Sequence, residues 1–175
     1  MKNILITGGT GFLGRYVVKE LLKNFDNKIT ILDNKETKDK QDKCDKKVDF
    51  IFADIRNKNE ILSTVKYFDS VYHIAGNIRT PMTDISKLHY DTNATGTLNL
   101  LDACSKNNIK RFIFISTCEV YGNKLKEGIS ENEKKEPTND YAKSKLAAEK
   151  YCKEFAKREH IKITVVRPGY IYGYG

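Results

Sequence analysis

The chain has 175 residues, of which 39% are hydrophobic and 31% charged, and its formal net charge is +8. This length predicts one domain over residues 1–175, and the ordinary hydrophobic content excludes collagen-like and disordered chains. No apolar run approaches the roughly 18 residues of a membrane span, and the run before Gly8 is too short for a signal peptide, so we expect a cytoplasmic protein with no membrane partner.

Short apolar runs alternate with longer helical stretches along the chain. The predicted strands are residues 3–7, 28–32, 48–52, 70–74, 111–116 and 162–166, and the predicted helices are residues 12–24, 58–67, 84–107 and 141–159. The strands are rich in Ile, Val and Phe without strict alternation, as expected where both faces are covered. Strands that alternate with helices predict an α/β fold, a doubly wound parallel sheet with right-handed crossovers.

The positive charge and the cysteines predict neither a nucleic-acid partner nor a metal. Residues 34–47 and 124–135 are lysine-rich polar stretches in which acidic residues are interspersed and no aromatic residues alternate with the lysines. This pattern favours solvated surface over a nucleic-acid groove. None of the four cysteines forms a Cys-x-x-Cys pair. Reduced thiols are expected at Cys44, Cys104 and Cys152, and Cys118 lies in the segment Thr117-Cys118-Glu119.

A glycine-rich loop follows the first predicted strand and opens a helix. Its glycines allow a tight turn and close approach of a pyrophosphate, and the last glycine lets the helix pack near the strand. The free N–H groups at the helix start face the phosphates. The loop predicts a dinucleotide site that includes Gly8, Gly11, Phe12, Leu13 and Gly14.

Asp33 ends the second predicted strand, about 20 residues beyond the glycines, where the dinucleotide fingerprint places an acid. A carboxylate here accepts hydrogen bonds from the adenosine ribose hydroxyls and repels a 2′-phosphate. We therefore expect Asp33, with the adjacent Asn34, to bind NAD in preference to NADP. An Asp-Asn turn without a ligand is the alternative, and Lys35 leaves some NADP use open.

Tyr141 and Lys145 stand at i and i+4 of a predicted helix, so their side chains project from one face. An ammonium group stabilises a phenolate, which would lower the pKa of Tyr141 and make it a general base. The spacing alone also occurs on ordinary helices. Together with the glycine loop and Asp33, it predicts a catalytic pair.

Taken together, these segments resemble the extended short-chain dehydrogenase/reductases of the NAD-dependent nucleotide-sugar epimerase/dehydratase family. The resemblance covers nearly the whole chain, and its segments occur in family order. They are Thr7-Gly8-x-x-Gly11-x-x-Gly14, Asp54-Ile55, His73-Ile74-Ala75-Gly76, residues 93–99 and 116–122, Tyr141-x-x-x-Lys145, and residues 167–173. The resemblance implies a Rossmann NAD(P)-binding fold.

The resemblance also implies residue roles around NAD. Asp54 and Ile55 would border the adenine, and Ala75 and Gly76 would lie along the nicotinamide ribose. Lys145 would hold the hydroxyls of that ribose. Asn93 would stabilise the fold and the active-site helix beside the cofactor.

The implied reaction begins when Tyr141 removes the proton of a sugar hydroxyl, typically at C4, as hydride passes to the nicotinamide. Thr117 would hydrogen-bond the reacting oxygen, with an ordinary strand-end threonine as the alternative, and His73 is expected to be a packing residue. The resulting 4-keto sugar can be epimerised by return of hydride to the other face, lose water, or lose carbon dioxide.

The segment Thr117-Cys118-Glu119 bears on which of these outcomes follows. Dehydratases of the family typically carry Thr-Asp-Glu, and a thiol is a weaker proton donor than a carboxylic acid, so Cys118 weakens the case for dehydration. Glu119 is either a base for chemistry at C5 or a structural acceptor.

The chain also departs from the family pattern. Family members continue into a C-terminal substrate region, whereas this sequence stops after residues 172–175, as a truncated chain or a short natural form. A non-catalytic NAD-binding module and a reductase of steroids or other ketones are therefore alternative functions. By resemblance, a homodimer would form through the helices at 84–107 and 141–159.

Overall fold

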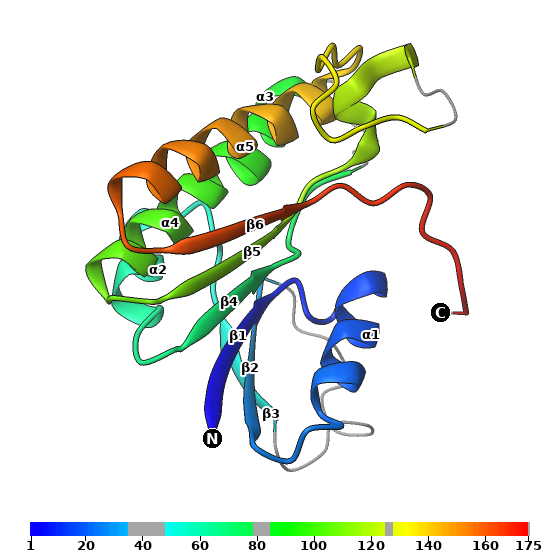
Figure 1. Ribbon diagram of the computed structural model, residues 1–175. Coiled ribbons are helices and arrows are strands. Elements are labelled where there is room, and N and C mark those ends of the chain that lie inside the picture. Colours follow the sequence, from blue (N-terminus) through cyan, green and yellow to red (C-terminus); the bar gives the residue numbers. More distant parts are fainter. Residues whose placement is uncertain (35–47, 79–84, 125–127, 175) are drawn as a thin grey trace.

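The computed structural model describes residues 1–34, 48–78, 85–124 and 128–174 (Figure 1). The expectations for Lys35 and Cys44 lie outside the described residues, as do most of the polar stretch at 34–47 and the first residue of the predicted helix at 84–107.

Six parallel strands form one sheet in the order β3-β2-β1-β4-β5-β6. From β1 the chain adds β2 and β3 on one side of the sheet, and it then crosses to the other side to add β4, β5 and β6. This is the strand order of the Rossmann fold. The doubly wound sheet predicted from the alternation of elements is confirmed. Its strands are β1 (Lys2–Thr7), β2 (Asn27–Asp33), β3 (Val48–Phe52), β4 (Ser70–His73), β5 (Arg111–Ile115) and β6 (Lys162–Val166).

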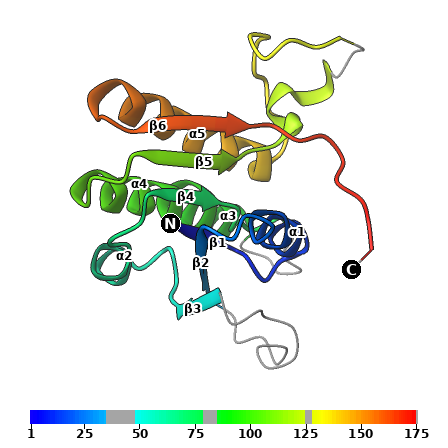
Figure 2. The same cartoon turned by 60° about the horizontal axis from the view of Figure 1, so that its bottom comes forward.

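Helices cover both faces of this sheet. Helix α1 (Phe12–Leu21) packs on one face, and α2 (Lys58–Thr64), α4 (Gly96–Lys106) and α5 (Asp140–Arg158) pack on the other (Figures 1 and 2). Ile4 and Ile6 belong to the core under α1, whereas Leu5 belongs to the core on the opposite face. Both faces of β1 are therefore buried, which explains why its sequence lacks alternation.

The helix predicted over 84–107 is divided. Its described part consists of α3 (Ile85–His89), a π-helical segment η2 (Tyr90–Thr95) and α4. In η2 the buried side chain of Asn93 binds the backbone of Asn77 on both sides: Oδ1 accepts from the N–H at 2.7 Å and Nδ2 donates to the carbonyl at 3.0 Å. Such π-helical segments often occur at functional sites.

His73 is a packing residue, as expected. It is fully buried, and burial holds its pKa well below the usual value. The Thr97 hydroxyl donates to the Asn93 carbonyl at 2.6 Å, so it accepts from His73 Nε2 at 2.9 Å. The Thr7 hydroxyl then donates to His73 Nδ1 at 2.7 Å. A neutral His73 therefore joins β1, β4 and α4.

In the described part of the chain, no helix combines the length and the apolar character needed to cross a membrane.

Candidate active site

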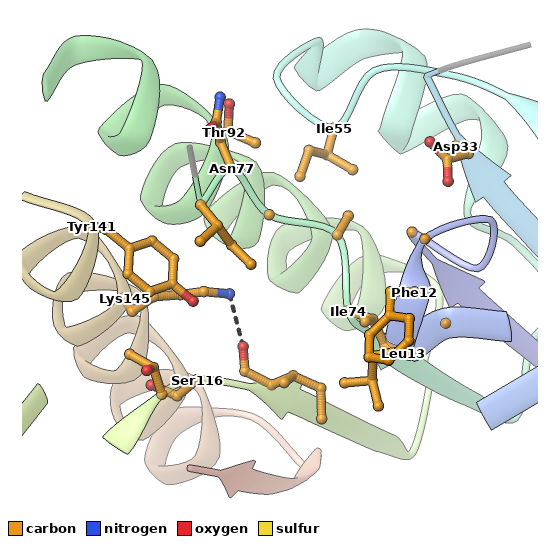
Figure 3. A pocket seen from close by; sticks show the side chains of 18 of the residues that line it. Phe12, Leu13, Asp33, Ile55, Ile74, Asn77, Thr92, Ser116, Tyr141 and Lys145 are labelled. Atoms are coloured by element: carbon orange, nitrogen blue, oxygen red, sulfur yellow. Dashed lines mark hydrogen bonds between the residues drawn. The ribbon is translucent and has the colours of Figure 1, made fainter. Parts of the chain in front are cut away.

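A cavity of about 890 Å³ lies beyond the carboxyl ends of the strands, at the point where the strand order reverses (Figure 3). Ligands of open α/β sheets bind in this position. Loops after β1 through β6 contribute to its wall. The predicted site residues that line it are Gly8, Gly11, Phe12, Leu13, Gly14, Asp33, Asn34, Asp54, Ile55, Ala75, Gly76, Thr117, Glu119, Tyr141 and Lys145.

The glycine loop forms a tight cradle at one end of the cavity. Gly8 has φ +70°, in the left-handed region that favours glycine. A Cβ on Gly14 would lie 2.1 Å from the Gly8 carbonyl oxygen, so α1 packs this close only with glycine there. The first residues of α1 therefore line the cavity beside the loop, where helix N–H groups favour an anion.

Asp33 is held against the glycine loop. Its Oδ2 accepts from the Thr10 hydroxyl at 2.5 Å and from the Thr10 N–H at 3.4 Å, and its Oδ1 accepts from the Asn34 N–H at 2.9 Å. Asp33 lies across the cavity from Tyr141 (Figure 3). Thr10 was not predicted as a partner from the sequence, although its hydroxyl lies inside the glycine motif.

Asp54 is paired with Arg56, whose Nη2 lies 2.5 Å from Asp54 Oδ2. The hydrogen bond from this guanidinium lowers the pKa of Asp54. Ile55 is 5% exposed, and its carbonyl accepts from the Asn99 side chain at 2.9 Å. Arg56 also lines the cavity. In the sequence, its position two residues after Asp54 is the one signal that could have marked it as a site residue.

Tyr141 and Lys145 project from α5 toward the cavity (Figure 3). Asn139 caps the start of this helix, where its side chain accepts from the Ala142 N–H at 2.8 Å. Lys145 Nζ donates to the Ile115 carbonyl at 2.8 Å and lies 4.8 Å from the centre of the Phe114 ring. Burial lowers the pKa of Lys145 to about 8.

The expected direction of the Tyr141 shift is wrong for the protein as the structure describes it. Burial raises the pKa of Tyr141 to about 12, the charge of Glu119 acts in the same direction, and a hydrogen bond with Thr117 opposes them. The Lys145 ammonium donates to the Ile115 carbonyl instead, so desolvation of the phenol dominates. Spacing along the helix therefore predicted the shared face but not the electrostatics.

Stability should depend on pH through Lys145. Its pKa is about 8 in the folded protein, against 10.5 for a lysine in the unfolded chain, so the unfolded chain binds more protons between these values, and the free energy of unfolding rises with pH there. We expect the free energy of unfolding of wild type to rise by roughly 3 kcal/mol relative to that of Lys145→Met over that pH range. Urea unfolding at several pH values measures it. Lys143→Met, an exposed lysine of the same helix, is the control. Parallel profiles for wild type and Lys145→Met would contradict the burial argument.

Thr117 and Glu119 follow β5 at the wall of the cavity. The Thr117 hydroxyl accepts from the Glu119 N–H at 3.2 Å, and Glu119 Oε2 accepts from the Asn139 side chain at 2.7 Å. Glu119 therefore accepts a hydrogen bond at the start of α5, and it also lines the cavity. Cys118 does not line the cavity, and its N–H donates to the Pro168 carbonyl at 2.9 Å.

Asn93 does not line the cavity, so a direct contact with a cofactor stays a prediction. Its Nδ2 also donates to the Ser144 hydroxyl at 2.9 Å, and that hydroxyl donates to the Tyr141 carbonyl at 2.7 Å. Asn93 thus connects the loop after β4 to the turn of α5 that carries Tyr141.

Arg167, directly after β6, belongs to a polar network. It forms two hydrogen bonds of 2.8 Å to Glu149, through Nε and Nη2, and a third of 2.8 Å to the Tyr121 hydroxyl. Glu149 also accepts from the Ser116 hydroxyl at 2.6 Å. The network connects β6, α5 and the end of β5, next to Thr117.

The described cysteines, Cys104, Cys118 and Cys152, are free thiols. Within residues 1–34, 48–78, 85–124 and 128–174, no group of three or more His, Cys, Asp or Glu side chains is placed to hold a metal ion.

Comparison with known proteins identifies one family. The model of the NAD dependent epimerase/dehydratase family matches residues 4–175. The chain is 30% identical to dTDP-D-glucose 4,6-dehydratase of Mus musculus, over 98% of this chain and 51% of that protein. It is 32% identical to a putative UDP-glucose 4-epimerase of Methanocaldococcus jannaschii, over 97% of this chain and 56% of that protein.

Solved structures agree with this result. UDP-glucuronic acid 4-epimerase from Bacillus cereus, in complex with NAD, has a TM-score of 0.86 and 29% identity, over 98% of this chain and 58% of that one. The Thermus thermophilus UDP-glucose 4-epimerase complex with NAD has a TM-score of 0.82 and 30% identity, over 94% of this chain and 54% of that one. The chain spans about half the length of the curated relatives it matches.

Proposed function

Because the chain belongs to the NAD dependent epimerase/dehydratase family, we propose that it binds NAD and acts on a nucleotide sugar through a transient 4-keto intermediate. One observation carries the proposal: the glycine cradle, Asp33 and the Tyr141–Lys145 pair line a single cavity at the switch point of the sheet. A module that only binds NAD has no evident need for the Tyr141–Lys145 pair.

The residues present fit NAD. A Cβ on Gly14 would collide with the backbone of Gly8 and Gly9, so glycine there lets α1 begin directly beside the loop, and the loop and the start of α1 would hold the pyrophosphate. Asp33 would accept hydrogen bonds from the adenosine ribose. At the other end, Ala75, Gly76 and Lys145 would hold the nicotinamide ribose.

When bound, NAD supplies a hydride acceptor and a positively charged ring. Tyr141 would accept the proton of the sugar hydroxyl at its phenol oxygen, with Thr117 bonded to the same sugar oxygen. A positive charge beside Tyr141 favours its phenolate and counteracts the burial that raises its pKa to about 12. Lys145 would contribute to that positive field while it orients the ribose.

Three outcomes are open to the 4-keto sugar: epimerisation, dehydration and decarboxylation. Glu119, which faces the cavity, would serve as the base that removes the C5 proton in dehydration. In decarboxylation the C5 carboxylate leaves as carbon dioxide, so C5 would need a proton donor and not a base. Among the described residues that line the cavity, Glu119 is the carboxylate beside Thr117, and this suits epimerisation, because return of hydride to the opposite face requires no second acid.

A second candidate function is a non-catalytic NAD-binding module, for which the glycine loop and Asp33 in the cavity wall would suffice. Incubation of the purified protein and NAD with a panel of nucleotide sugars, followed by mass spectrometry and NMR, separates the two. Product of unchanged mass indicates epimerisation, loss of water indicates dehydration, and loss of carbon dioxide indicates decarboxylation. Bound NAD without product would favour the module, and failure to bind NAD would reject both.

Asp33 should determine the preference for NAD over NADP. Its carboxylate, held by Thr10, would repel a 2′-phosphate. We expect Asp33→Ser to lower the ratio of NAD to NADP affinity by about 10-fold, which corresponds to about 1.4 kcal/mol. Calorimetric titration with both dinucleotides measures it. Asp49→Ser, at an exposed position of the neighbouring strand, should leave the ratio unchanged. An unchanged ratio in Asp33→Ser would remove Asp33 from this role.

Two further expectations stay predictions. They are a cytoplasmic location and a homodimer formed through the region of α3–α4 and through α5. Light scattering of the purified protein measures the second, and a monomer at micromolar concentration would contradict it.

A further inference from the structure

A buried histidine faces the candidate catalytic tyrosine. His89, at the end of α3, is 4% exposed, and its ring lies edge-on to the ring of Tyr141, with the ring centres 6.0 Å apart and an interplanar angle of 63°. The proposed reaction has no step that uses His89. Aromatic pairs favour this edge-to-face geometry, which restricts the plane of the second ring.

The orientation of His89 is itself held by a hydrogen bond. Its Nδ1 lies 3.0 Å from the carbonyl oxygen of Asn77. A carbonyl oxygen only accepts, so Nδ1 carries a proton and donates to it. Asn77 lines the cavity directly after Gly76, so this bond connects His89 to the wall where the nicotinamide ribose would lie.

The same carbonyl is connected to Tyr141 by a second route. Asn93 Nδ2 donates both to the Asn77 carbonyl at 3.0 Å and to the Ser144 hydroxyl at 2.9 Å. The Ser144 hydroxyl donates to the Tyr141 carbonyl at 2.7 Å. Asn93 thus connects through Ser144 to the backbone of Tyr141, whereas His89 contacts its ring. Both residues also donate a hydrogen bond to the Asn77 carbonyl.

We propose that His89 is a positioning residue for Tyr141. Its ring restricts the plane of the phenol, and its bond to Asn77 sets that ring relative to the cavity wall, so the phenol oxygen faces the reacting hydroxyl. This inference rests on the proposed function. Small errors in such geometry cost catalysis heavily, since misplacement of about 1 Å can cost about 10²-fold in rate.

Two substitutions separate the ring contact from the hydrogen bond. His89→Asn keeps an amide donor near the position of Nδ1 and loses the ring, whereas His89→Phe keeps a ring and loses the donor. We expect kcat of His89→Asn to fall about 10-fold, with KM and the NAD dissociation constant within about 3-fold of wild type. His89→Phe should recover part of that loss. His160→Asn, an exposed histidine, is the matched control.

The kinetic result overturns the proposal in two cases. In the first, kcat of His89→Asn stays within about 3-fold of wild type. In the second, both variants lose activity only in proportion to their loss of folded protein, as circular dichroism would show, which indicates a packing role alone.

A second readout does not require turnover. In protein labelled with ¹³Cζ-tyrosine, the Tyr141 signal is the one absent from Tyr141→Phe. His89→Asn should displace this signal, His89→Phe should displace it less, and His160→Asn should leave it in place. An unmoved Tyr141 signal in His89→Asn would overturn the proposal. If the wild type binds NAD but converts no nucleotide sugar, the proposed function fails while this test of His89 still applies.

Discussion

Replacement of Tyr141 by Phe should lower kcat by about 10³-fold and leave the NAD dissociation constant within about 3-fold of wild type. The phenol oxygen is the atom proposed to accept the sugar proton, and Phe keeps the ring that packs against His89. The two measurements, turnover of the substrate found in the panel and NAD titration, distinguish lost chemistry from lost binding.

The control for this variant is Tyr151→Phe. Tyr151 lies on the same helix, α5, and is 36% exposed, so the same atom is removed away from the cavity. Its kcat should equal that of wild type. If Tyr141→Phe retained wild-type turnover, Tyr141 would not be the base, and Glu119 would be the next group of the cavity wall to test.

Gly14→Ala should abolish measurable NAD binding and destabilise the fold. The added Cβ would lie 2.1 Å from the Gly8 carbonyl oxygen and 2.7 Å from the Gly9 Cα, and both are backbone atoms that cannot rotate away. Either α1 moves off β1 or the turn at Gly8 opens, and both changes deform the cradle. Overpacking typically costs about 1–3 kcal/mol, and we expect a cost at the upper end of that range. Thermal unfolding and NAD titration measure the two effects.

Gly169→Ala is the matched control for stability. A Cβ there meets no atom within 4 Å, and its backbone is outside the left-handed region. Its melting temperature should equal that of wild type. A Gly14→Ala variant with wild-type melting temperature and NAD affinity would show that the loop accommodates a side chain, and the steric argument for the cradle would fail.

The strands could be predicted closely from the sequence. Predicted and observed bounds agree for β3 (Val48–Phe52) and β6 (Lys162–Val166), because runs of apolar and β-branched residues report burial within a sheet. The helix over 84–107 was less predictable: its described part includes a π-helical segment, and Asn93 in that segment binds Asn77, 16 residues away. Local periodicity contains no information about that contact.

The candidate site shows the same division between local and distant contacts. The sequence by itself determined the glycine loop, the acid at the end of β2 and the shared helix face of Tyr141 and Lys145, because each depends on short spacings and on backbone geometry. Only the tertiary structure decided which groups these residues meet. Thr10 binds Asp33, and the Ile115 carbonyl takes the Lys145 ammonium that spacing had assigned to Tyr141.

Burial is the physical reason why the pKa of Tyr141 differs from the value that the sequence predicts. A helix face specifies direction, whereas the pKa of Tyr141 depends on how much solvent is removed from the phenol and on the charge of Glu119, which comes from a different segment. His89 is the same case, since its ring reaches Tyr141 only because α3 packs against α5. Contacts between residues distant in sequence are created by packing of the elements, so the sequence determined the elements and their chemistry, and the fold decided the partners.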